Sequence, residues 1–196
     1  DSRSSFAGNP LLISLDDLVT DGLLREEDVS APPAFRTSKV QFGRVSSWKT
    51  RRLRRAHQNF LNGDGSELQD AYESFVRSAS DWLEDYALYE ALRAAHAGDP
   101  WYQWPTSLRL HHREALNTWR STLAGEVAYH RFIQFVFERQ WHALKAFAST
   151  HGVTIMGDVP IYVALDSAEV WGSQEQFLLD ANGQPEVQAG VPPDLF

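Results

Sequence analysis

The amino-acid sequence predicts an α/β fold in which a long, mainly helical region leads into a buried parallel strand. Apolar residues recur at helical spacing over most of residues 46–151. The period then changes at residues 153–156, a short β-branched run between two glycines that is typical of a buried strand. Because a closed barrel of eight such strands needs about 250 residues, this chain can hold only part of a (β/α)8 barrel, with one or two of its strands.

Apolar spacing and stop signals indicate where the individual helices begin and end. Ser14, followed by Asp17 three residues later, has the pattern of a helix start. Gly125 marks a candidate break inside the last long helix, and Asn182-Gly183 predicts a hairpin turn. The predicted helices cover about 14–22, 46–62, 66–98 and 105–152, and residues 26–38, with two adjacent prolines, are predicted as a loop.

Composition excludes several classes of protein. With 18 Lys and Arg against 26 Asp and Glu, the formal net charge is −8. The absence of cysteine excludes a disulfide scaffold, a cysteine nucleophile and a thiolate metal site. The longest clean apolar run, residues 160–165, is too short to cross a bilayer, and no signal-peptide pattern is present. We expect a cytoplasmic protein without metal or cofactor. Because the sequence begins at Asp1 without methionine and stops after Pro-Pro-Asp-Leu-Phe, we also expect it to be cut from a longer chain.

Charge and aromatic residues are unevenly distributed. Residues 39–55 hold seven Lys and Arg and no acid, which suits either nucleic acid or the solvated face of a helix. The net charge of −8 of the whole chain favours the solvated helix face over nucleic-acid binding. After Lys145 only acidic charges follow, which favours a neutral or cationic ligand there. The aromatic cluster at residues 101–105 suits either sugar stacking or a loop packed on a helix, and spacing alone favours the loop.

The region most suited to chemistry is residues 157–171, directly after the predicted strand. It holds three carboxylates and two aromatic residues, a combination that suits carbohydrate because acids bind hydroxyls and rings stack on sugar faces. Asp158 stands at the carboxyl end of the strand, where active sites of parallel α/β proteins collect. Its alternative role is to cap the next loop.

Residues 157–171 resemble a motif of the 4-alpha-glucanotransferase family (amylomaltase or disproportionating enzyme, glycoside hydrolase family 77), in which a strand ends in G-D-x-P-I-[YF]-V-A-x-D-S-A-[DE]-V-W. Further similar motifs lie, in the family's order, at residues 5–13, 82–88, 101–105, 137–141 and 177–194. The resemblance therefore covers essentially the whole chain.

This resemblance implies a (β/α)8 TIM barrel with a large, mainly α-helical inserted subdomain, of which the chain is an internal segment. Residues 1–45 would be a barrel-associated segment and loop, and residues 46–151 the helical subdomain leading into a barrel helix. Residues 152–196 would be a barrel strand with active-site loops.

The resemblance also implies a retaining transfer of α-1,4-glucan chains between maltodextrins or starch-type glucans, with no nucleic-acid or membrane partner. Asp158 matches a carboxylate at the scissile-bond subsite, Phe196 an aromatic of a loop over the acceptor side, and Phe42 a position of a remote glucan groove. Leu195 replaces the usual tyrosine, and Phe42 lacks the hydroxyl of the tyrosine often found there. The nucleophile and the acid/base lie beyond Phe196, so the segment alone is expected to be inactive.

Three further residues match motif positions and are candidate glucan-binding residues: Asp166, Trp171 and Asp194. Asp166 and Trp171 are interpreted as mainly structural. The alternative to an enzyme segment is a non-catalytic helical carbohydrate-binding module built from residues 46–151.

Overall fold

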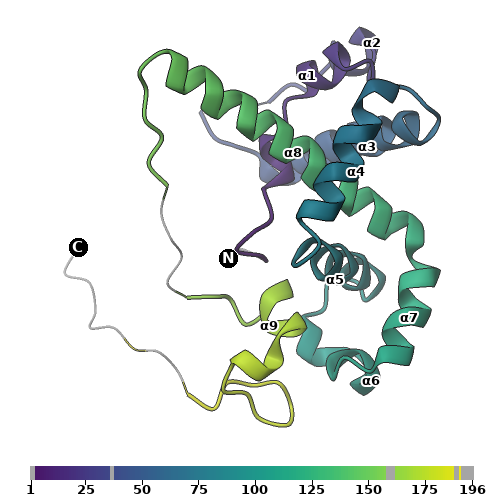
Figure 1. The fold of residues 1–196 in the computed structure, drawn as a ribbon, viewed down its shortest axis with the longest axis vertical. Coiled ribbons are helices and arrows are strands. Elements are labelled where there is room, and N and C mark those ends of the chain that lie inside the picture. The colour runs from purple at the N-terminus through teal and green to yellow at the C-terminus, as the bar shows by residue number, and fades with distance from the viewer. Residues whose placement is uncertain (1–2, 36–37, 158–161, 188–189, 191–196) are drawn as a thin grey trace. The chain divides into compact units, whose positions relative to one another are not determined.

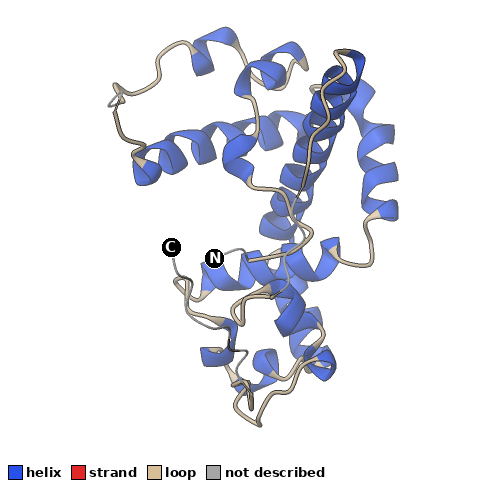
Figure 2. Cartoon of the chain, turned by 90° about the vertical axis from the view of Figure 1, so that its left-hand side faces the viewer, coloured by secondary structure: helices blue, strands red, loops and turns tan. Residues whose placement is uncertain are grey.

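The structure is a computed structural model that describes residues 3–35, 38–157, 162–187 and 190. Over these residues the chain is helix and loop, without a β-strand (Figures 1 and 2). The α-helices are α1 (Leu15–Thr20), α2 (Glu26–Val29), α3 (Phe42–Leu61), α4 (Gln69–Ser78), α5 (Leu83–Ala95), α6 (Thr106–Arg109), α7 (Arg113–Thr122), α8 (Ala124–Thr150) and α9 (Ala168–Gly172). Short 3₁₀ helices are η1 (Pro10–Leu12), η2 (Ser66–Leu68), η3 (Trp101–Gln103) and η4 (Gln174–Gln176).

The chain forms two compact units, each assembled from segments that are distant in sequence. Unit 1 contains Asp1–Phe6, Asp85–Val127 and Val159–Phe196, and unit 2 contains Ala7–Glu84 and Ala128–Asp158. The domain boundaries predicted at residues 45 and 151 stay a prediction.

The first helix forms as the sequence predicts. The Ser14 hydroxyl accepts a hydrogen bond from the Asp17 amide at 3.1 Å, which caps α1. Gly22, with φ of +71°, ends it. The loop predicted over 26–38 is wrong at its start. Here α2 forms because the Asp28 carboxylate accepts the Arg25 amide at 3.0 Å and closes a helical turn.

The long predicted helices are broken into shorter ones. Helix α3 begins at Phe42, four residues before the predicted start. The stretch predicted over 66–98 divides into η2, α4 and α5, with the break after Ala79 at Ser80 and Asp81, residue types that favour helix ends. The stretch predicted over 105–152 divides into α6, α7 and α8. The second of these breaks is at Leu123, two residues before Gly125.

Unit 2 is built around an aromatic and aliphatic core between α3 and α8. Phe132 and Phe135 of α8 are fully buried in a cluster that also contains Phe60 of α3 and the buried leucines of α1. Ring centroids of Phe60 and Phe132 are 5.2 Å apart. These contacts explain why the apolar spacing of the two helices was visible in the sequence.

Two glutamines of α8 hold the backbone that precedes α1. Gln134 accepts the Gly8 amide at 2.7 Å and donates to the Gly8 carbonyl at 3.1 Å. Gln140 does the same to Ser14, at 2.7 and 3.0 Å. Each side-chain amide thus pairs with a backbone residue as a neighbouring strand would. A Cβ atom at Gly8 would lie 2.0 Å from the Phe137 ring, so the backbone approaches α8 too closely for any side chain there.

The strand predicted over residues 153–156 does not form. These residues are irregular, and Val153, Ile155 and Met156 are exposed rather than buried. A strand is stable only where a neighbouring strand accepts and donates its backbone hydrogen bonds. Among the described residues no strand is available to pair with it.

The predicted hairpin at Asn182-Gly183 is confirmed as a short one. A single antiparallel bridge joins Leu179 and Pro185, and Gly183 has φ of +75°. The Asp180 carboxylate accepts the amides of Asn182 and Gln184 at 2.8 and 2.9 Å. These backbone hydrogen bonds lower the pKa of Asp180.

Candidate functional site

The sequence-predicted site residues fall into three groups in the structure. Asp158, Asp194 and Phe196 lie outside the described residues. Phe42 is the first residue of α3 in unit 2, with 68% of its surface exposed. Asp166 and Trp171 both lie in unit 1, Asp166 two residues before α9 and Trp171 within it. Asp166 and Trp171 are therefore the two that the structure brings together.

Asp166 is held by two elements that are distant in sequence. The Tyr89 hydroxyl of α5 donates to its Oδ1 atom at 2.7 Å, and the Arg93 guanidinium of α5 donates to its Oδ2 atom. The backbone amide of Trp101 in η3 lies 3.3 Å from Oδ1. Arg93 and Asp166 keep only 23% and 27% of their side-chain surface exposed. The carboxylate is therefore occupied by donors of the chain itself, and its contact with glucan stays a prediction.

Trp101 holds the residue before Asp166. Its indole Nε1 donates to the Leu165 carbonyl at 2.6 Å, and its side chain is completely buried. Trp104 is also buried, and its ring stacks on His96 with centroids 5.5 Å apart. The aromatic cluster at 101–105 is therefore packed on α5, as spacing alone favoured, rather than open for sugar stacking.

Trp171 is completely buried in unit 1. Its Nε1 donates to the Leu108 carbonyl at 3.0 Å, and its ring centroid lies 5.9 Å from that of Tyr89. Tyr89 thus contacts both Trp171 and Asp166. The indole serves as core for α9, and its role toward glucan stays a prediction.

The segment before α9 is also joined to the beginning of the chain. The Ala168 amide donates to the Arg3 carbonyl at 2.9 Å, and the Glu169 carboxylate accepts the Ser4 hydroxyl and the Ser5 amide at 2.5 and 3.1 Å. Arg3 forms an ion pair with Glu90 of α5 at 2.8 Å. The motif at residues 157–171 therefore contacts residues 3–5, of which Ser5 is the first residue of the motif at 5–13.

Burial changes the titration of the groups around Asp166. Burial raises the pKa of Glu90, while the charges of Arg3 and Arg93 act in the opposite direction. Burial also raises the pKa of the Tyr89 phenol, and the hydrogen bond to Asp166 adds to this shift. Tyr89 therefore stays a neutral hydrogen-bond donor over the whole physiological pH range.

A cavity of about 610 Å³ lies between the segment before Asp166 and the hairpin. One wall is Tyr162, Val163 and Leu165, and the other includes Phe177 to Leu179 with Pro185 and Val187. Tyr162 and Leu178 are 61% and 64% exposed. An apolar lining with a phenol and the Gln176 amide nearby suits a flat group with an apolar face, such as a sugar ring.

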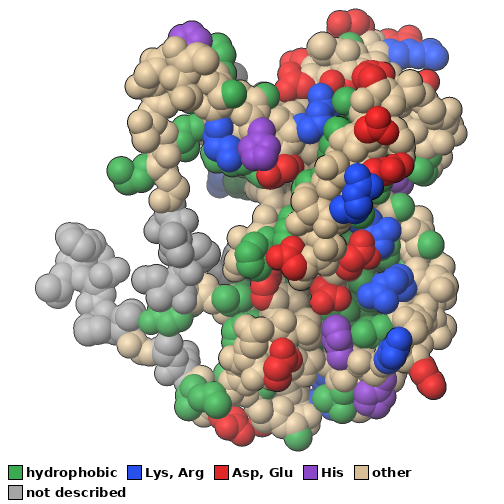
Figure 3. Space-filling model, in the orientation of Figure 1, with side chains coloured by type: hydrophobic (Ala, Val, Ile, Leu, Met, Phe, Trp, Pro, Cys, Tyr) green, Lys and Arg blue, Asp and Glu red, His purple; other side chains and the backbone are tan. Residues whose placement is uncertain are grey.

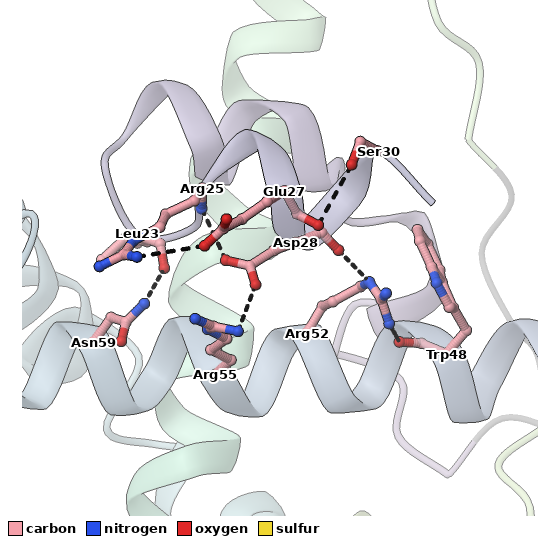
Figure 4. Close-up of polar contacts among 9 residues, drawn as sticks. All are labelled: Leu23, Arg25, Glu27, Asp28, Ser30, Trp48, Arg52, Arg55 and Asn59. Atoms are coloured by element: carbon pink, nitrogen blue, oxygen red, sulfur yellow. Dashed lines mark hydrogen bonds and ion pairs between the residues drawn. The ribbon is translucent and has the colours of Figure 1, made fainter. Parts of the chain in front are cut away.

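The basic region at residues 39–55 is used largely for contacts within the chain. Figure 4 shows α2 lying over α3, with Arg55 paired to Asp28 at 2.6 Å and Arg52 donating to the Asp28 carbonyl at 2.7 Å. Lys49 donates to the Leu11 carbonyl at 2.6 Å, and the Arg54 guanidinium lies 4.3 Å from the Tyr129 ring centroid. Figure 3 draws the face on which α8 and α4 lie in front of α3, and there Lys and Arg side chains lie among Asp and Glu. These contacts favour the structural interpretation.

The described residues form neither a metal site nor a membrane-spanning helix. No three His, Asp or Glu side chains among them come together as a metal site would require. No helix in the described part of the chain is long and apolar enough to span a membrane.

Sequence reasoning missed Tyr89 and Arg93. They are four residues apart and so share one face of α5, a signal that the sequence did contain. Their partner is 73 to 77 residues further along the chain, and only the fold shows that pairing.

Comparisons with known proteins give a consistent result. The sequence profile of the 4-alpha-glucanotransferase family, glycoside hydrolase family 77, matches residues 1–196. The chain is 48% identical to the 4-alpha-glucanotransferase of Thermus thermophilus over 195 residues, which is 100% of this chain and 38% of that protein. It is 40% identical to that of Synechocystis over 194 residues, 98% of this chain and 38% of that protein.

Among solved structures, the amylomaltase from Streptococcus agalactiae in complex with acarbose has a similar fold, with a TM-score of 0.92 and 31% sequence identity. The match covers 100% of this chain and 39% of the amylomaltase chain. The chain thus spans less than two fifths of the length of each of these relatives.

Proposed function

This chain belongs to the 4-alpha-glucanotransferase family, and from that premise we propose that it is an internal segment of an enzyme that transfers α-1,4-glucan chains between maltodextrins. The observation that carries the proposal is the match of the family profile to the whole chain, together with 48% identity to the Thermus thermophilus enzyme. The acarbose bound to the related amylomaltase supports an α-glucan as the substrate class.

The proposed chemistry is a retaining double displacement. One carboxylate attacks the anomeric carbon and forms a glycosyl-enzyme as the second carboxyl protonates the leaving oxygen. That second group then deprotonates the acceptor sugar hydroxyl, which displaces the enzyme and restores both carboxyl groups. We assign both groups to parts of the enzyme outside this chain.

Within the chain we assign Asp158 to binding the glucose unit at the scissile bond. A carboxylate that accepts hydroxyl hydrogen bonds there stabilises the transition state as the ring flattens. In the whole enzyme, residues 153–156 would become a barrel strand, because neighbouring strands would then supply the hydrogen-bond partners that the described residues lack. This arrangement would place Asp158 at the carboxyl end of a barrel strand.

The test uses the full-length protein that contains this segment. We expect it to convert maltotriose into glucose and longer maltodextrins, and Asp158→Asn to lower the transfer rate about a thousandfold, within the range known for loss of electrostatic transition-state stabilisation. Asp70→Asn, at an exposed position on α4, is the matched control and should keep the wild-type rate. A near-wild-type rate for Asp158→Asn would refute its assigned role, and absence of any product ladder would refute the proposed activity.

The isolated 196-residue chain distinguishes the enzyme segment from a binding module. We expect it to have no transfer activity. Cooperative unfolding together with maltodextrin binding by calorimetry would instead support the non-catalytic helical module.

A further inference from the structure

We infer that Tyr89 and Arg93 of α5 are positioning residues that act through Asp166 on the segment Tyr162–Leu165, and so on the glucan transfer step. The inference rests on the proposed function, because the transfer reaction is the process that would be affected. Neither Tyr89 nor Arg93 lies within the motifs that match the family.

The first step is that Asp166 is fixed from two directions. Tyr89 binds one carboxylate oxygen at 2.7 Å, and Arg93 binds the other. Both donors come from one face of α5, and burial holds each in place. A carboxylate with both oxygens bound cannot rotate without breaking a charge-assisted hydrogen bond, which makes Asp166 a fixed end for the segment before it.

The second step is that the same anchor acts on the backbone. Trp101 donates its amide to Asp166 at 3.3 Å and its indole N–H to the Leu165 carbonyl at 2.6 Å. The segment that ends at Leu165 is therefore fixed at two consecutive residues. It begins only four residues after Asp158 in the sequence.

The third step is that the anchored segment forms one wall of the 610 Å³ cavity. Tyr162, Val163 and Leu165 line it on this side. The opposite wall is the hairpin, whose Gly183 backbone lies so close to Trp101 that a Cβ there would be 2.6 Å from the Trp101 Cη2 atom. Trp101 thus supports both walls. A shift of Asp166 would move the first wall relative to the second.

A small displacement near a reacting centre is costly, because a 1 Å misplacement can lower the rate about a hundredfold. Removal of an ion pair with a purely structural role would instead lower the thermal stability without changing the transfer rate. The chain offers such a pair as a matched control. Arg131 and Glu84 form an ion pair in unit 2 with 26% and 33% of their side-chain surface exposed, close to the 23% and 27% of Arg93 and Asp166.

The experiment measures kcat and KM for maltotriose in the full-length enzyme, well below the thermal midpoint of each variant. We expect Arg93→Ala to lower kcat about tenfold or more and to change KM less than about twofold. Arg93→Lys should recover most of the loss, since it keeps a cationic donor. Tyr89→Phe, which retains the buried ring, should lower kcat about threefold.

Arg131→Ala should lower the thermal midpoint by a similar amount but keep kcat within about twofold of wild type. Equal kcat losses in Arg93→Ala and Arg131→Ala, or no rescue by Arg93→Lys, would overturn the inference while leaving the proposed function intact. If Arg93→Ala does not fold, Tyr89→Phe decides alone, and an unchanged kcat in it would overturn the inference. A wild-type enzyme without transfer activity would overturn the proposed function and this inference together.

Discussion

His111 lies in the left-handed backbone region, with φ of +57°, between α6 and α7. Its ring meets Trp171 edge to face with centroids 4.2 Å apart. Its Nε2 atom is buried and has no hydrogen-bond partner among the described residues. A non-glycine residue at positive φ with an unpaired ring nitrogen is held there by its surroundings rather than by its own preference.

This histidine predicts how stability depends on pH. Burial lowers the pKa of His111, and Arg120 acts in the same direction. The unfolded chain therefore takes up a proton near pH 6.5 while the folded chain does not, so His111 stabilises the fold at neutral pH and that contribution is lost as the pH falls below 6.5. Asparagine tolerates positive φ and does not titrate.

We expect the thermal midpoint of the wild type to fall faster between pH 7.5 and 5 than that of His111→Asn. The other titrating groups are common to both proteins and cancel in the difference. Circular-dichroism melts at half-unit pH steps would check this, and parallel curves for the two proteins would contradict it.

Asp166 and Trp171 show what can be predicted from sequence at this scale. Both stand in a motif dense in acids and aromatic residues, and the motif located them in the candidate site. Their mainly structural interpretation fits a buried indole and a carboxylate occupied by Tyr89 and Arg93. The identity of those donors could not be predicted, because it depends on which face of α5 turns toward a segment more than 70 residues away.

At the scale of elements, the hairpin around residues 179–185 depends on its contact with η3. Gly183 combines positive φ with a close approach to the Trp101 ring, whereas Gly98 has φ of +89° and no atom near its hypothetical Cβ. The two glycines therefore share a backbone requirement and differ in packing.

We expect Gly183→Ala to destabilise the protein by about 1–3 kcal/mol more than Gly98→Ala, because the buried Trp101 ring cannot move away from an added methyl group. In the thermal midpoint this corresponds to a further loss of roughly 2–4 °C per kcal/mol for a chain of 196 residues. Thermal unfolding followed by tryptophan fluorescence would measure it. Equal losses of stability in the two variants would show that backbone strain alone accounts for the effect and that the contact with Trp101 adds nothing.

Helix boundaries were predictable where local signals are strong and were missed where those signals are weak. The Ser14 cap and the Gly22 stop of α1 could be located to the residue because both act within one turn. The break at Leu123 lies two residues before the predicted candidate Gly125, whereas the break after Ala79 interrupts a continuous apolar pattern with only Ser80 and Asp81 as weaker signals. The strand at 153–156 failed for another reason, because strand formation depends on partners that periodicity does not report.

At the scale of the whole molecule, the described chain leaves large apolar side chains uncovered. The last turns of α8 and the residues after it expose Leu144, Phe147, Val153 and Met156, with Met156 94% exposed. Large exposed apolar groups that are close in sequence mark a surface that binds another part of a protein. In the proposed whole enzyme this partner would be the rest of the barrel.

We therefore expect the isolated 196-residue chain to self-associate and to bind a hydrophobic dye, whereas the full-length protein should do neither. Sedimentation velocity and dye fluorescence would measure this. Replacing Phe147 and Met156 by serine in the isolated chain should reduce both signals, and Leu110→Ser, at an exposed position in unit 1, is the control. If the isolated chain is monomeric and binds no dye, the apolar surface at the end of α8 does not bind another part of the protein.

Gln134 and Gln140 have a consequence for how the segment before α1 can vary. Their amides bind the backbone N–H and C=O groups of Gly8 and Ser14. Neither glutamine therefore requires a particular side chain at residue 8 or 14. Gly8 is required because it must leave room for Phe137, Ser14 because it caps α1, and Ile13 because it is buried in the core. The constraint that these four hydrogen bonds impose lies on Gln134 and Gln140, since glutamate would keep the acceptor and lose the donor.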